Sequence, residues 1–96
     1  MSTVITREMG FTHSQLRRVL SDAARGRPYQ VGDDKVTIDP GEGRSITISF
    51  DPETVRKIAS ISLPLTVVHF ELAGYDEGGV KAEMELLSTH FHKGGG

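Results

Sequence analysis

The feature that most constrains the fold is a pair of single apolar stripes at helical spacing, one near each end of the chain. The first stripe recurs at i, i+3, i+4 and i+7 and consists of Leu16, Val19, Leu20 and Ala23. The second stripe consists of Val80, Met84, Leu87 and Phe91. Thr12 and Gln15 have the spacing of a capping box, and Gly26 with Pro28 predicts where the first helix ends. Two amphipathic helices of this kind need an apolar sheet face to cover.

Between the two stripes the hydrophobic pattern changes to alternation, which predicts strands with one polar face. The predicted strands cover residues 3–9, 29–31, 35–39, 44–50 and 65–72. Gly10 and Gly74 are expected to end the first and the last of these strands, and Asp76 is expected to cap the second helix.

The segment 51–61 is ambiguous. Asp51 and Pro52 suit a helix start, and Val55 and Ile58 fit one helical face. The residues from Ile58 onward also suit an extended chain. A short helix is favoured, and a strand is the alternative.

The expected order is β-α-β-β-(short α or β)-β-α. It predicts an α+β domain with a single antiparallel sheet of four to five strands and two long amphipathic helices packed on one face. Ferredoxin-like and TBP-like or helix-grip arrangements both accommodate this order, and segment 51–61 decides between them. We expect one domain over residues 1–93 and a flexible glycine tail over 94–96.

Composition excludes several chemistries. The chain has 96 residues and no cysteine, which excludes disulfides, thiolate nucleophiles and cysteine-ligated metals. No apolar run reaches membrane-spanning length, and the N-terminal residues lack the apolar core of a signal peptide. We therefore expect a soluble protein of the cytoplasm that has no contact with the membrane.

The formal net charge of −2 opposes tight nucleic-acid binding, but the charge is unevenly spread. Residues 1–31 carry five arginines against two acidic residues. Arg17, Arg18 and Arg25 on the first helix are candidate contacts for an anionic partner. A solvated helix face is the favoured interpretation of these arginines.

Histidines offer two weak candidates. His90 and His92 near the end of the second helix do not share one helical face, so a metal site is not favoured. His69 shares the predicted polar sheet face with Ser and Thr hydroxyls, but no sequence signature of a catalytic triad accompanies it. We expect no enzyme activity, no metal and no cofactor.

The polar sheet face is the other candidate surface, with Thr47, Val67 and His69 as its binding residues. This face has no Phe or Tyr on which bases can stack, which argues against RNA binding. Gly41-Glu42-Gly43 joins two alternating strands and is expected to be a hairpin turn rather than a phosphate loop.

Two functional hypotheses follow. The favoured one is a non-catalytic accessory or protein-interaction module, which binds a partner or forms a homodimer through an unpaired strand edge. The alternative is a small-ligand binder with a cavity between the C-terminal helix and the sheet. That cavity would be lined by Phe50, Phe70, Met84 and Leu87.

Overall fold

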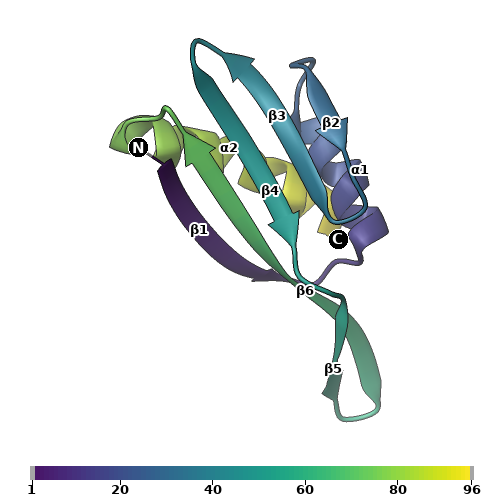
Figure 1. The fold of residues 1–96 in the computed structure, drawn as a ribbon. Helices are drawn as coiled ribbons and strands as arrows, with labels where there is room; N and C mark the ends of the chain where they lie inside the picture. The colour runs from purple at the N-terminus through teal and green to yellow at the C-terminus, as the bar shows by residue number, and fades with distance from the viewer. Residues whose placement is uncertain (1, 96) are drawn as a thin grey trace.

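The structure, a computed structural model, describes the backbone of residues 2–95 and the side chains of residues 2–91. Its strands are β1 (Ser2–Met9), β2 (Tyr29–Val31), β3 (Lys35–Gly41), β4 (Arg44–Phe50), β5 (Thr54–Ile58) and β6 (Ile61–Ala73). Its helices are α1 (His13–Ala23) and α2 (Glu77–Gly95). Figure 1 shows the two helices together on one side of the sheet, with β5 and the start of β6 projecting from the body.

The predicted fold class is confirmed: the chain forms one antiparallel sheet with two helices, in the order β-α-β-β-β-β-β-α. The strand order across the sheet is β1-β6-β4-β3-β2, and β5 pairs with the first part of β6. Every pair is antiparallel. Because five consecutive strands separate α1 from α2 and α2 is the last described element, the element order agrees with the helix-grip alternative and not with the ferredoxin-like order βαββαβ.

The short helix favoured for residues 51–61 does not form. The alternative, a strand, is correct: the segment contains β5, followed by a tight turn into β6. Asp51 caps no helix: its carboxylate lies 3.0 Å from Nε2 of His69, and its backbone N–H donates to the carbonyl of Val67 at 2.9 Å. From Thr54 to Ile58 the chain pairs residue by residue with the strand that returns from Ile61. This ladder satisfies the backbone groups, and β-branched residues suit it better than a helix.

Helix α1 forms as its sequence predicts. Thr12 accepts a hydrogen bond from the backbone N–H of Gln15, and the Gln15 side chain accepts one from the N–H of Thr12, which completes the capping box. The four residues of the stripe are all buried. After Ala24 the chain leaves the helix through Arg25 and Gly26, which both have positive φ.

The core lies between the two helices and the face of the sheet that they cover. Alternate residues of the inner strands form the sheet side of the core, and the two helical stripes form its helix side. Its fully buried strand residues are Val36, Ile38, Ile46, Ile48, Val68, Phe70 and Leu72. From the helices come Leu16, Leu20 and Leu87, while Met84 and Phe91 are also buried. The rings of Phe70 and Phe91 pack edge to face, with 5.8 Å between their centroids.

Helix α2 begins as predicted and continues further than predicted. The Asp76 carboxylate accepts a hydrogen bond from the backbone N–H of Gly79 at 2.6 Å, which caps the first turn. The helix continues to Gly95 and therefore includes Gly94 and Gly95. A glycine in a helix costs only about 1 kcal/mol relative to alanine, so two of them need not stop it. Gly96 lies outside the described residues, and the flexibility of the tail stays a prediction.

A buried ion pair joins the two helices. Arg27, just beyond α1, donates to both carboxylate oxygens of Glu83 on α2, at 2.8 and 3.3 Å. The same guanidinium also donates to the carbonyls of Ala23 and Ala24 at the end of α1. The Tyr75 hydroxyl donates to Glu83 at 3.3 Å. Burial raises the pKa of the Tyr75 hydroxyl above its usual range, and the Glu83 carboxylate raises it further.

Over the residues that the structure describes, neither α1 nor α2 is both long enough and apolar enough to cross a membrane.

Candidate functional site: a groove between β1 and α2

Strand β1 forms one edge of the sheet. It pairs along its full length with β6 on one side and has no strand on its other side among residues 2–95. Its side chains alternate: Ile5 lies on the helix side, where it packs against the core, while Thr6 lies on the opposite face and contacts His69. An exposed strand edge presents unpaired backbone N–H and C=O groups, so it can accept a further strand.

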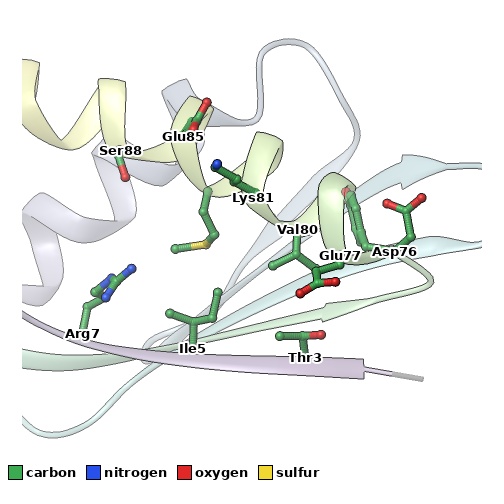
Figure 2. Close-up of a pocket in the computed structure, with 11 residues that line it drawn as sticks. Thr3, Ile5, Arg7, Asp76, Glu77, Val80, Lys81, Glu85 and Ser88 are labelled. Atoms are coloured by element: carbon green, nitrogen blue, oxygen red, sulfur yellow. The ribbon is translucent and has the colours of Figure 1, made fainter.

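A groove of about 830 Å³ runs between this edge strand and α2. Figure 2 shows side chains from both elements pointing toward the space between them. The lining residues are Thr3, Ile5, Arg7, Tyr75, Asp76, Glu77, Val80, Lys81, Met84, Glu85 and Ser88. On α2 they recur at helical spacing, and on β1 they are alternate residues, so each element contributes one face. The volume lies within the range of about 300–1,000 Å³ that is usual for ligand sites.

The groove exists because α2 packs toward α1 rather than over the edge of the sheet. Leu87 and Phe91 are buried in the core, and Glu83 is held to Arg27 beyond α1. These contacts fix the inner side of α2 and leave Val80, on the side toward β1, only partly buried. Ile5 is likewise half-buried, so the two apolar side chains face a space that the chain itself does not fill.

Charge changes along the groove. In Figure 2, Thr3 lies near Glu77 and Asp76 at one end, and Arg7 lies below Ser88 at the other end. Ile5 and Val80 lie between these ends. Along β1 the groove therefore runs from Glu77 at the end where β1 begins, past apolar Ile5, to Arg7, while Lys81 and Glu85 add one charge of each sign on the α2 wall between these ends.

The arginines of α1 do not form one surface. Arg17 donates to the carbonyl of Asp33 at 2.7 Å, which ties α1 to the turn between β2 and β3. Arg18 is exposed on the helix, and Arg25 is exposed in the turn that follows it. Arg17 thus has a structural partner, whereas anion binding by these arginines stays a prediction.

The three predicted residues of the polar sheet face lie on the same uncovered face. Thr47 on β4 and His69 on β6 come from neighbouring strands, and Val67 lies two residues before His69. The structure adds two residues that the sequence did not associate with His69. The Thr6 hydroxyl lies 3.1 Å from its Nδ1, and the Asp51 carboxylate lies 3.0 Å from its Nε2.

The Thr6–His69–Asp51 chain has the order of a nucleophile, a base and an orienting carboxylate. With its proton on Nε2, His69 donates to Asp51 and accepts from the Thr6 hydroxyl. However, the His69 side chain is 36% exposed and that of Asp51 is 52% exposed, so water reaches the whole chain. A catalytic constellation needs a substrate site beside it that excludes water, and the groove lies on the other face of the sheet.

The remaining predicted sites are placed as follows. His90 lies near the carbonyl of Leu86 in its own helix, 3.2 Å from Nδ1, and the side chain of His92 lies outside the described residues. Among the side chains that the structure describes, no three of His, Asp or Glu lie close enough together to hold a metal ion. Of the residues expected to line a ligand cavity, Phe50, Phe70 and Leu87 are packed in the core, and only Met84 reaches the groove.

Comparisons of the chain with family models, with curated proteins and with solved structures found no match. The groove is therefore interpreted from its own geometry. Sequence reasoning identified its two walls, the strand over 3–9 and the stripe of Val80 and Met84, but it did not bring them together. The imperfect alternation of the β-branched residues over 3–9 is the signal in the sequence that favours an edge strand.

Proposed function

We propose that the chain is a non-catalytic protein-interaction module that binds an extended segment of a partner in the groove between β1 and α2. The segment adds to the free edge of β1 as a further strand. Its alternate side chains enter the groove, while the side chains between them lie over the opposite face of the sheet. The observation that carries this proposal is the coincidence of an unpaired strand edge with a partly apolar groove.

Strand addition explains why both features are needed. Backbone hydrogen bonds to the strand edge supply affinity that does not depend on sequence, and pockets for alternate side chains supply selectivity. A small molecule would use the groove but not the strand edge. The eight residues of β1 offer an edge about 27 Å long at the usual rise per residue of a strand. That length accommodates a segment of five to eight residues.

The charges of the groove define the segment that fits. If the segment runs antiparallel to β1, its N-terminal part lies beside Arg7 and its C-terminal part beside Glu77. Side chains at alternate positions should then be acidic, apolar and basic in that order. The middle side chain contacts Ile5, Val80 and Met84.

The test is an NMR titration of the protein, labelled with ¹⁵N, against a five-residue peptide with this acid-x-apolar-x-base pattern. We expect the largest shift changes at the backbone amides of β1 and at the groove side of α2. A peptide with the acid and the base exchanged should bind more weakly, because each charge then meets its like.

The matched control is the same peptide with methyl groups on the backbone nitrogens that face β1. It keeps every side chain but cannot form the strand ladder, so its binding should be lost. Equal binding of the methylated peptide would contradict strand addition. Shift changes confined to Thr47, Val67 and His69 would place the interaction on the other face of the sheet.

A further inference from the structure

The hairpin formed by β5 and the first residues of β6 has the properties of an unsatisfied contact surface. We call the range 53–65 the arm. It projects from the body along the longest dimension of the molecule, 48 Å against 23 and 22 Å for the others. Its large exposed apolar residues are Val55, Ile58, Ile61 and Leu63. Val55 lies on one face of the hairpin, whereas the paired residues Ile58 and Ile61 lie with Leu63 on the other face. A two-stranded hairpin of this kind is marginally stable by itself, and exposed apolar residues mark contact sites.

The arm carries the pattern that the groove requires. Val55 and Lys57 are alternate residues of β5 and point to the same face, and Glu53 precedes the strand by one residue in the same alternation. Read from the N-terminus, they are acidic, apolar and basic. Val55 is 62% exposed, so its side chain is available for contact.

An antiparallel register brings all three side chains to matching positions. When Val55 of one copy lies opposite Ile5 of another, Lys57 lies opposite Thr3, beside Glu77. In the same register Glu53 lies opposite Arg7. Glu53 already accepts a hydrogen bond from the N–H of His13 through Oε1, and it keeps Oε2 for the contact with Arg7.

The strand edges also match. β5 pairs with β6 on one side only, and among residues 2–95 no strand lies on its other side. At the usual rise per residue, its five residues span about 17 Å, which is less than the edge offered by β1. Figure 1 shows the arm projecting from the body, which it contacts at its base through Glu53 and Arg56, so a second copy can approach its outer part.

We infer that the occupant of the groove is the arm of a second copy of this chain, with residues 53–57 paired antiparallel to β1 in the register 53 to 7, 55 to 5 and 57 to 3. This inference rests on the proposed function, since it uses the same groove. Each copy has one arm and one groove. Reciprocal exchange therefore gives a closed dimer, and sequential exchange gives a longer chain of copies.

The experiment is sedimentation equilibrium over a range of protein concentrations, with thermal unfolding to show that each variant is folded. Val55→Asp removes the central apolar contact from an exposed position and should leave a monomer. Lys57→Glu and Glu77→Lys each place like charges together, and each should raise the dissociation constant by about tenfold or more. The double variant Lys57→Glu with Glu77→Lys restores opposite charges and should associate as the original chain does. Arg56→Gln, on the opposite face of the same strand, is the matched control: it removes only an exposed ion pair with Glu8 of the same chain, at 3.9 Å, and should change association by less than about twofold.

Two results would overturn the inference. One is a protein that stays monomeric at about 1 mM, a concentration above which weak specific contacts are populated. The other is association that persists in Val55→Asp or that the double variant does not restore.

The monomeric Val55→Asp variant separates this inference from the proposed function. It keeps its groove, so it should bind the blocked peptide Glu-Thr-Val-Arg-Lys, the sequence of residues 53–57. If the original chain is monomeric but the groove binds this peptide, the inference fails and the proposed function stands. If the peptide does not bind either, both fail.

Discussion

The two halves of strand β6 both alternate, but their apolar residues lie on opposite faces and have different surroundings: Ile61 and Leu63 in the first half, Phe70 in the second. From Thr66 to Ala73 the strand lies between β1 and β4, and its alternate residues Val68, Phe70 and Leu72 are fully buried beneath the helices. From Ile61 to Leu65 it pairs only with β5. There Ile61 is 58% exposed.

This difference shows that hydrophobic alternation specifies a strand but not what covers it. In the body, the two helices remove the apolar face of the sheet from water. In the arm, no described element lies over the apolar side chains, although the strand continues without a break. The arm is therefore the part of the molecule where contact with a second chain would remove the most exposed apolar surface from water.

The largest expected difference between the two halves concerns stability. Phe70→Ala in the body should lower the free energy of unfolding by about 3–5 kcal/mol, because it leaves a cavity in the core. Leu63→Ala in the arm should lower it by less than about 0.5 kcal/mol, because Leu63 is already 45% exposed in the folded chain. Urea unfolding at low protein concentration measures both. A loss at Leu63 equal to that at Phe70 would mean that the arm is covered within a single chain.

A smaller effect is expected from the ion pair that holds the body together. Glu83→Ala should lower the free energy of unfolding by about 2 kcal/mol, since it leaves the Arg27 guanidinium without its carboxylate. This loss of unfolding free energy is smaller than that expected for a fully buried ion pair, because the Arg27 side chain is 22% exposed. Glu85→Ala, two residues along on the exposed side of α2, is the control and should stay within about 0.5 kcal/mol. Equal losses in the two variants would show that the pair does not join the helices.

A smaller effect than that of breaking the ion pair is expected from removing the arm. A variant in which Thr54–Leu63 is replaced by an Asn-Gly turn keeps β4, the long part of β6 and both helices. Its free energy of unfolding should change by less than about 1 kcal/mol, because an exposed hairpin contributes little. Circular dichroism during urea unfolding measures this change. An unfolded variant would show that the body depends on the arm, contrary to the comparison of the two halves.

Local pattern was sufficient to predict much of the body. The capping box at Thr12 and the stripe through Leu20 define α1 from contacts within one helix, and the alternation in β3 and β4 defines their buried faces. Segment 51–61 was predicted wrongly because its local signals conflict. Asp51 and Pro52 suit a helix start, whereas the pairing of Thr54–Ile58 with the returning strand is a contact that no helical pattern reveals.

The candidate site was likewise predictable in part, since local pattern predicted single residues but not the contacts between them. The sequence indicated that His69 lies on a polar sheet face, but the contacts of His69 with Thr6 and Asp51 join residues that are 63 and 18 positions apart. The groove likewise joins β1, at the start of the chain, to α2, at its end. Such contacts depend on strand order, which a single sequence does not specify.

The sequence by itself determined that two amphipathic helices cover one face of an antiparallel sheet, because periods of 3.6 and 2 residues express which side of each element is apolar. Only the tertiary structure decided that β1 and α2 enclose a groove, that α2 leans toward α1 and that the arm projects alone. The physical reason is that these features depend on how the elements are placed against one another, and most of all on which surfaces they leave without a neighbour.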